Sequence, residues 1–217
     1  FAFAAGASNT ASGVYSTAIG GLNSAAGTNS TAFGNLNTAS GNHSTAFGYN
    51  NTASGSGSFA WGFQATTRGI QGARAYSSSS RANVGDAQII GQPVRWTTTD
   101  ATTTTPTSDG VAVAAYNVLV LPNNSSLTGL VQISARDSSG NCASWLLFCR
   151  VSRGANAAST AVDFQTTVAS NLSAALSTAT AVIAADTTQG ALVISVTGVA
   201  ATTIDWIADP SCLQLVR

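Results

Sequence analysis

Small, polar and bulky residues recur with a period of 14 residues along the first third of the chain. Glycine fills two columns that are offset by seven positions, and alanine, asparagine and a bulky residue fill others. The glycines are Gly6, Gly20, Gly34, Gly48 and Gly62 in one column, and Gly13, Gly27, Gly41, Gly55 and Gly69 in the other. A fixed period that holds through five repeats indicates a solenoid. The pattern predicts a parallel β-roll whose coils each contain two short strands and two corners.

The glycine columns are expected to mark the corners of each coil. Glycine tolerates a positive φ and lets two backbones approach closely, and other residues do neither easily. The predicted corner residues are Gly20, Gly27, Gly34, Gly41, Gly48 and Gly55. Equivalent residues of successive coils then stack at about 4.8 Å, so each column forms a ladder along the roll.

Strand alternation sorts the remaining columns into two faces, because successive side chains point to opposite sides. In the segment 16–20, Thr17 and Ile19 share one face, and Ser16 and Ala18 share the other. We place the bulky column in the core of the roll: Ile19, Phe33, Phe47 and Trp61. We place the alanine column on a flat outer face that packs against copies of the chain around a threefold axis: Ala18, Ala32, Ala46 and Ala60. The alternative is a monomeric solenoid with a solvated alanine face.

The repeat element Ser-Thr-Ala-Phe-Gly-x-x-Asn-x-Ala-x-Gly stands at residues 30–41 and, with one more Asn, at 44–55. It resembles the head repeat of trimeric autotransporter adhesins of the YadA type, which also occurs in phage tail fibres. The resemblance covers about a third of the chain and implies a left-handed parallel β-roll in a homotrimer.

The pattern changes after residue 76. Residues 77–86 are polar and without period, and we interpret them as a linker between a β-roll at 1–76 and a second domain at 87–217. Alternating segments rich in β-branched residues follow, separated by turn residues. The predicted strands are 88–99, 111–121, 127–135, 143–153, 161–168, 179–184, 191–199, 204–208 and 212–216. This arrangement predicts an antiparallel β-sandwich or jelly roll, so the fold class is all-β.

Residues 85–217 resemble a terminal domain common in phage tail fibre proteins. The segments that carry the resemblance are 97–102, 121–125, 190–198 and 204–208. The resemblance implies a domain that lies at the tip of the fibre and contacts the surface of the host cell.

Composition narrows the functional classes. Only 7% of the residues are charged, and Glu, Lys and Met are absent, so the chain's surface relies on Ser, Thr, Asn and Gln. Such a surface suits a protein held in an assembly. The formal net charge is zero and the arginines are scattered, which argues against nucleic-acid binding. No apolar run reaches 18 residues, so we expect no membrane insertion. The chain starts inside a repeat without Met, and we expect it to be a fragment or a processed product.

Residues able to carry catalysis are scarce. His43 is the only histidine, lies in a variable column and is expected to be exposed. The three cysteines are expected to be buried free thiols, with a Cys149–Cys212 disulfide as the alternative. Most of the eight Asp lie in predicted turns, where Asp usually caps its own backbone. We therefore expect no enzyme, no metal and no cofactor, with glycan cleavage by paired carboxylates as the alternative. Trp96 beside Arg95 is expected in a core or interface, or alternatively stacked on a sugar.

These features together predict an extracellular, virion-borne tail-fibre segment. Its expected partners are two copies of itself, other tail or baseplate proteins, and a glycan or outer-membrane component of the host. The candidate receptor-binding residues lie in loops expected at the far end of the second domain: Asp100, Arg136, Asp137 and Asn141. The alternatives are the head of a bacterial trimeric adhesin, or a trimerisation domain without receptor contact.

Overall fold

The computed structural model describes all 217 residues, which divide into two compact units. The first unit contains residues 1–91 and 213–217, and the second contains residues 92–212. The boundary differs from the predicted one at residue 86 because residues 87–91 form a strand that pairs with the β-roll. The last residues of the chain also belong to the first unit, where the Val216 amide donates to the Asp86 carbonyl over 2.8 Å.

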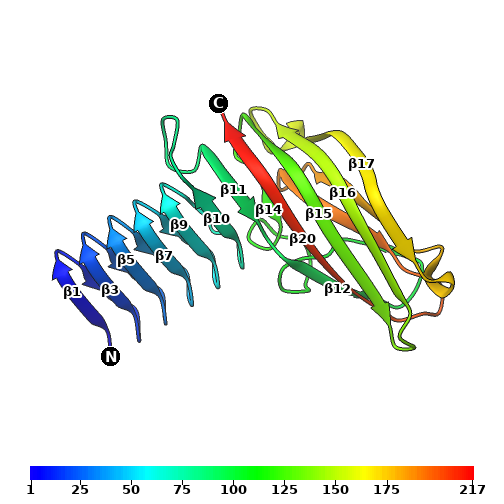
Figure 1. Ribbon diagram of the computed structural model, residues 1–217, viewed down its shortest axis with the longest axis horizontal. Coiled ribbons are helices and arrows are strands. Elements are labelled where there is room, and N and C mark those ends of the chain that lie inside the picture. The colour runs from blue at the N-terminus through cyan, green and yellow to red at the C-terminus, as the bar shows by residue number, and fades with distance from the viewer. The chain divides into compact units, whose positions relative to one another are not determined.

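The first unit begins with a parallel β-roll (Figure 1). Each coil contributes one long and one short strand, and every strand pairs with the residues 14 positions further along, as Ala18 does with Ala32. The long strands are β1 (Phe3–Ala7), β3 (Thr17–Gly21), β5 (Thr31–Asn35), β7 (Thr45–Tyr49) and β9 (Phe59–Phe63). The short strands are β2 (Thr10–Ala11), β4 (Ser24–Ala25), β6 (Thr38–Ala39) and β8 (Thr52–Ala53). The predicted 14-residue β-roll is confirmed.

Two further strands extend the long-strand sheet of this unit. β10 (Arg74–Ser77) pairs in parallel with β9, and β11 (Ala87–Gly91) pairs antiparallel with β10. Between them lies the predicted linker, which is an ordered loop. Burial alone would raise the pKa of Asp86, but backbone amides of Asn83, Ala82 and Arg81 donate to its carboxylate and hold the pKa below its usual range.

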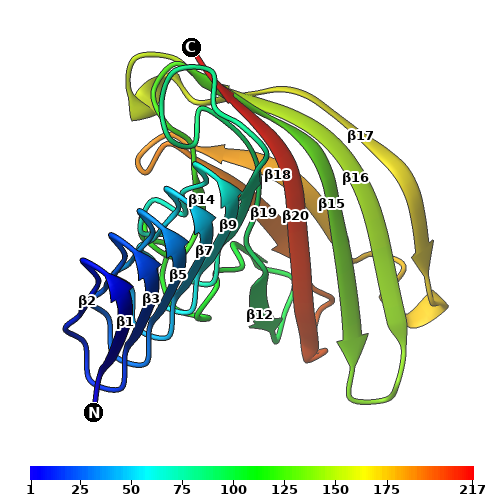
Figure 2. The same ribbon diagram turned by 60° about the vertical axis from the view of Figure 1, so that its left-hand side comes forward.

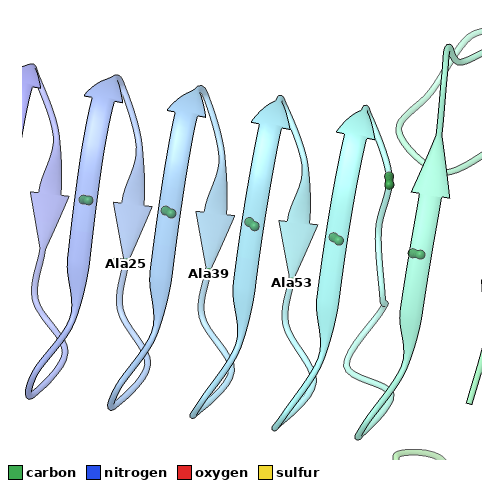
Figure 3. Packing of buried hydrophobic residues seen from close by; sticks show 9 residues of the cluster. Ala25, Ala39 and Ala53 are labelled. Carbon is green, nitrogen blue, oxygen red and sulfur yellow. The ribbon is translucent and has the colours of Figure 1, made fainter. Parts of the chain in front are cut away.

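Alanine side chains fill the interior of the β-roll (Figure 3). The alanines of the long strands face those of the short strands, and all of the following are fully buried: Ala18, Ala32, Ala46 and Ala60, with Ala25, Ala39 and Ala53 opposite. The predicted outer alanine face is therefore wrong. The predicted core column is wrong as well: Phe33 and Phe47 are exposed, and Ile19 and Trp61 are half-buried. Facing sheets usually lie about 10 Å apart, and an interior filled by small side chains is narrower and has no room for rings. A column of buried serines, Ser16, Ser30, Ser44 and Ser58, shares the alanine face of the long strands.

The asparagine column forms a buried hydrogen-bonded ladder that closes each coil. The Asn37 side-chain amide donates to the carbonyls of Phe33 and Gly48 at 3.0 and 2.7 Å. The Asn37 Oδ1 accepts from the backbone and side-chain amides of Asn51, both at 3.0 Å. The same contacts recur at Asn23 and Asn51. Each asparagine therefore ties its own coil to the next.

The two glycine columns are required by close backbone contact. Gly34 has a φ of 117°, and a Cβ there would overlap the carbonyl oxygen of Gly48 in the next coil. Gly27 has no such φ, but a Cβ there would overlap the Gly41 carbonyl oxygen. Other turn residues, including Leu36 and His43, also adopt a positive φ. The predicted corner glycines thus act mainly by permitting neighbouring coils to approach.

The second unit contains two antiparallel sheets, visible together in Figure 2. The larger follows the order β12 (Val94–Thr98), β20 (Ile204–Val216), β15 (Ser125–Asp137), β16 (Cys142–Arg153) and β17 (Ala161–Leu172). In the smaller sheet, β19 (Ala191–Thr197) pairs with β13 (Thr103–Thr104), β14 (Leu119–Val120) and β18 (Thr180–Asp186). Trp145 and Trp206 stack in the core with ring centroids 5.5 Å apart. The predicted all-β class with antiparallel sheets is confirmed.

Several predicted strands differ from those observed. The segment 88–99 breaks at Pro93 into β11, which pairs with β10, and β12, which pairs with β20. The segment 111–121 forms a strand only at β14, because Asn117 organises the residues before it as a loop. The two pieces predicted at 204–208 and 212–216 form one strand, β20. The helices are the short 3-10 turns Ala157–Ser159 and Ala174–Leu176, and no helix has the length and hydropathy needed to span a membrane.

Enlarging an interior alanine should destabilise the roll. Ala46→Leu is expected to lower the free energy of unfolding by at least about 1–3 kcal/mol, because the narrow interior cannot accept three more carbons. Thr45→Leu, one position away on the outer face, serves as the control and should change stability by no more than about 0.5 kcal/mol. Urea unfolding followed by circular dichroism measures both. Equal losses would contradict the assignment of alanine to the interior.

Removing one ladder side chain should cost more than removing an exposed one. Asn37→Ala leaves the Asn51 amides and the Phe33 and Gly48 carbonyls without their partner, at a cost on the order of 1–3 kcal/mol for each group that stays buried and unpaired. Asn35→Ala removes an exposed amide of the same coil and should be nearly neutral. The melting temperatures of the two variants should differ by several degrees. If Asn37→Ala lowers the melting temperature no more than Asn35→Ala does, the ladder does not contribute as described.

Candidate functional site

An outward column of apolar side chains runs across the long-strand sheet of the first unit. Strand register places one residue from each of seven adjacent strands in line: Ala5, Ile19, Phe33, Phe47, Trp61, Tyr76 and Ile89. Phe33, Phe47, Tyr76 and Ile89 are 37–50% exposed. The Phe33 and Phe47 rings stack at 5.3 Å, and Trp61 lies 5.6 Å from Tyr76.

Further aromatic rings widen this surface. Tyr49 stacks on Phe63 at 4.9 Å, and Phe59 stacks on Trp61 at the same distance. Contiguous exposed apolar surface of this kind marks interaction sites in soluble proteins. We call this surface the aromatic column and define it as Ile19, Phe33, Phe47, Tyr49, Phe59, Trp61, Phe63, Tyr76 and Ile89. Four of these nine residues, Ile19, Phe33, Phe47 and Trp61, were predicted from the sequence to lie in the core.

Four connections gather at one end of the second unit, as predicted. Register aligns the end of β12 with the start of β20, the start of β16 with the end of β17, and the start of β18 with the end of β19. The connections at this end are 99–102, 138–141, 173–179 and 198–203, which lie at the lower right of Figure 1. The candidate receptor residues therefore lie at or beside this end.

Asp137 and Asn141 bond to each other and close the β15–β16 turn. The Asp137 carboxylate accepts from the side chain and backbone of Asn141, both at 2.8 Å, and from the Ser139 amide at 2.9 Å. The Asn141 side chain and these amides together hold the pKa of Asp137 below its usual range. Asp137 thus caps its own turn, as expected for an Asp in a turn, and Asn141 completes that turn.

Asp100 and Arg136 are exposed and lie apart from each other in the sheet. Asp100 follows β12, where its carboxylate accepts from the Thr102 amide at 2.7 Å, which lowers its pKa. Arg136 ends β15 opposite Cys142. β20 lies between β12 and β15. Receptor binding by Asp100, Arg136, Asp137 and Asn141 stays a prediction.

A depression of about 520 Å³ lies where β12 and β20 meet the loop that contains Asp109. It is lined by Arg95, Trp96, Thr97, Asp109, Gly110, Asp205 and Trp206. Arg95 and Thr97 share the exposed face of β12 and lie opposite Ile207 and Asp205 of β20. Thr97 Oγ1 donates to Asp205 Oδ1 over 2.7 Å. Trp96 is half-buried and pairs with the buried Trp206, so it belongs to the opposite face of β12 from Arg95 and Thr97.

Asn117 sets the far wall of this depression. It is fully buried, and its side-chain amide donates to Asp109 Oδ1 at 3.0 Å and to the Ala112 carbonyl at 2.9 Å, while its Oδ1 accepts from the Ala114 amide at 2.7 Å. Burial raises the pKa of Asp109, but hydrogen bonds from Asn117, Val111 and Thr107 outweigh this and lower it. Asp109 is therefore ionised at neutral pH. We call this site the Arg95 depression.

A second depression of about 500 Å³ lies on the exposed face of the larger sheet. Its apolar centre includes Leu146 and Ile207, and Gln132, Ser144 and Asn171 lie at its polar margin. Leu130 and Phe164 are exposed on neighbouring strands of the same sheet. This face thus carries several exposed apolar side chains among polar ones.

The single residues that were considered for catalysis, metal binding or ligand binding have ordinary structural positions. His43 is exposed at a turn with φ 56°. The cysteines are free thiols: Cys149 and Cys212 are buried as expected, whereas Cys142 is exposed. Trp145 and Trp206 are core residues, as expected.

The Asp137 turn should make stability depend on pH. The folded pKa of Asp137 lies below its unfolded value of about 3.9. Its stabilising contribution is therefore present above that unfolded pKa and is lost as pH falls through the folded pKa. Asp137→Ala should lower the melting temperature at pH 7 and approach the wild type at pH 2–3. Asp163→Ala, an exposed strand carboxylate, serves as the control. A loss that is independent of pH would contradict the interpretation.

Comparison with protein families identifies the repeats. The family model of the YadA head domain repeat, which spans two copies, matches residues 2–23, 11–37, 25–51 and 39–65. The β-roll and its period are thus those of an adhesin-type head repeat, and this part of the predicted resemblance is confirmed.

Comparison with solved structures gives a weaker likeness. The tailspike protein of Acinetobacter phage vB_ApiP_P1 is similar over 100% of this chain, with 9% identity and a TM-score of 0.30. The match spans 47% of the tailspike chain. No curated protein matches this sequence. What the comparisons show is therefore confined to the β-roll: residues 2–65 of this chain are YadA-like head repeats.

Proposed function

We propose that this chain is a segment of a homotrimeric tail fibre that attaches a virion to a cell surface. The observation that carries the proposal is the aromatic column, together with the YadA-like identity of the repeats beneath it. The first unit is held together by its alanine interior and asparagine ladder, so the column is not needed for the fold of one chain. Its place on the surface is explained if it packs against other copies.

Closed threefold packing suits this column because it is straight and runs along the stacking direction of the coils. Three copies arranged around one axis bring three equivalent columns together, and each strand contributes one more layer of apolar contact. Burying a Phe or Ile side chain contributes about 1.5–3 kcal/mol, so a column of this length supplies ample association energy. The trimer face is thus the bulky column, in place of the alanine column.

The second unit supports the proposed place of the chain on a virion and its proposed binding to a receptor. Residues 85–217 resemble terminal domains of phage tail fibres, which favours a virion over a bacterial surface. The second unit also gathers four loops at one end and carries a polar depression with two aspartates and an arginine in its lining. We propose that it binds a surface component of the host, without catalysis.

A second candidate function is favoured by the exposed apolar face of the larger sheet. Leu130, Phe164 and Ile207 lie on this face beside the second depression. In this alternative the second unit contributes to trimerisation and makes no receptor contact. The variants below separate the two possibilities.

Solution mass should report the trimer and its face. Light scattering during size exclusion is expected to give three times the 21.6 kDa of one chain. Phe33→Ser with Phe47→Ser should yield a folded monomer, because polar hydroxyls replace the centre of the column. Val14→Ser, an exposed apolar residue outside the column, is the control and should stay trimeric. A monomeric wild type would overturn the proposal, and dissociation by Ile207→Ser alone would favour the second candidate.

A further inference from the structure

The end of β20 belongs to the first unit, and we call its residues 213–216 the C-terminal strap. Side chains alternate between two faces along it. Leu213 and Leu215 are 64% and 49% exposed, whereas Gln214 between them is 3% exposed. A strand whose leucines face outward and whose glutamine faces inward reverses the usual arrangement of a half-buried strand. This reversal is explained if a partner covers the two leucines.

Two polar side chains hold the strap on the rest of the first unit. The Arg68 guanidinium donates to Gln214 Oε1 at 2.5 Å and to the Gly85 carbonyl at 2.6 Å, and Gln214 Nε2 donates to the same carbonyl at 2.7 Å. Burial lowers the pKa of Arg68 to about 10, so the guanidinium is still protonated at neutral pH. The strap backbone is fixed as well, because the Val216 amide donates to the Asp86 carbonyl at 2.8 Å.

The neighbouring strand β11 presents its own glutamine to the same side. β11 and β20 are adjacent in the sheet. Gln88 of β11 is buried, its Nε2 donates to the Thr66 carbonyl at 3.0 Å, and its Oε1 accepts from the Thr66 amide at 2.9 Å. This Oε1 would lie 3.1 Å from a Cβ at Gly85, the residue whose carbonyl binds Gln214. The two glutamines therefore share the inner face of the sheet.

Strand alternation then places Ile89, Leu213 and Leu215 together on the outer face. Ile89 is the last member of the aromatic column, in register with Tyr76 of β10. The strap belongs to the next strand of the same sheet, and its two leucines are exposed as Ile89 is. The exposed apolar surface of the first unit therefore continues from the aromatic column onto the strap.

We infer that Leu213 and Leu215 complete the surface by which copies of this chain associate, and that Arg68 and Gln214 hold them in place. The inference rests on the proposed function, because it adds a strand to the trimer face. The partner is a second copy, since the two leucines continue a face for which the proposed threefold packing supplies an equivalent face. Arg68 and Gln214 are positioning residues that act on the interface through the strap. Contacts between residues 146 positions apart thereby make assembly depend on docking of the strap.

Sedimentation velocity over a dilution series of the full chain tests the leucines of the strap. Leu213→Ser with Leu215→Ser should raise the concentration at which the trimer dissociates by at least about tenfold, because every copy loses two apolar side chains from the interface. Val14→Ser with Val111→Ser replaces two exposed valines outside the column, and this matched control should dissociate as the wild type does. Circular dichroism checks that each variant is folded. Leu213→Ser alone carries the same test if the double variant does not fold.

Hydrogen exchange at the Val216 amide tests the positioning residues separately from assembly. The background is the Phe33→Ser, Phe47→Ser monomer, in which association does not protect the strap. Gln214→Leu keeps the size of the side chain but removes its hydrogen bonds, so it should speed exchange in this background and weaken the trimer about tenfold in the otherwise wild-type chain. Gln214→Glu keeps an acceptor for Arg68 and should restore part of both properties.

The outcomes separate this inference from the proposed function. If the wild type is a trimer and Leu213→Ser with Leu215→Ser dissociates at the same concentration, the inference is overturned and the proposed function stands. A wild type that is monomeric at every concentration overturns both. Unchanged exchange in Gln214→Leu, or faster exchange with a trimer as tight as the wild type's, removes the positioning role of Gln214 and Arg68.

Discussion

The narrow interior of the 14-residue coil determines the rest of the β-roll. Two sheets joined by such short corners leave room only for small side chains, such as those of Ala18, Ala32 and Ala46. Larger apolar side chains of the same strands are forced outward, where Phe33 and Phe47 form the aromatic column. A single chain is thereby given a dry interior and an apolar exterior. The size of the coil thus leaves an apolar surface that the single chain does not cover, and the proposed trimer would cover it.

The same constraint selects polar residues that a larger core would exclude. Coils that stack on each other leave no space for a Cβ at Gly34, and they place carbonyls where the Asn37 amide reaches two of them. A buried asparagine is expensive unless every group finds a partner. Repetition supplies the partner: Asn37 Oδ1 accepts from the amides of Asn51, just as Asn23 Oδ1 accepts from the amides of Asn37. The ladder fixes register between coils, which methyl contacts alone do not specify.

Sequence periodicity predicted the period, the pairing of equivalent residues and the glycine columns, since each is a local consequence of the repeat. It did not predict which face of the strand is interior. Alternation groups Ile19 with Thr17 and Ala18 with Ser16, but it is symmetric between inside and outside. The width of the coil decides which face is interior. That width follows from the conformation of the corners, where residues such as Leu36 and His43 adopt left-handed backbone. The preference for burying bulky side chains in a core was therefore misleading here.

The second unit shows why its candidate site was harder to find than its strands. Strand segments such as 125–137 are marked by their own alternation, whereas the Arg95 depression depends on residues about a hundred positions apart that β12–β20 pairing brings together. Asn117, which lies within the predicted strand 111–121, is the residue that places Asp109. The carboxylate of the predicted receptor residue Asp137 is used locally, by Asn141 and Ser139. In a chain with so few charges, a carboxylate held by one neighbour across strands, such as Asp205, is better placed to bind a ligand than one that closes its own turn.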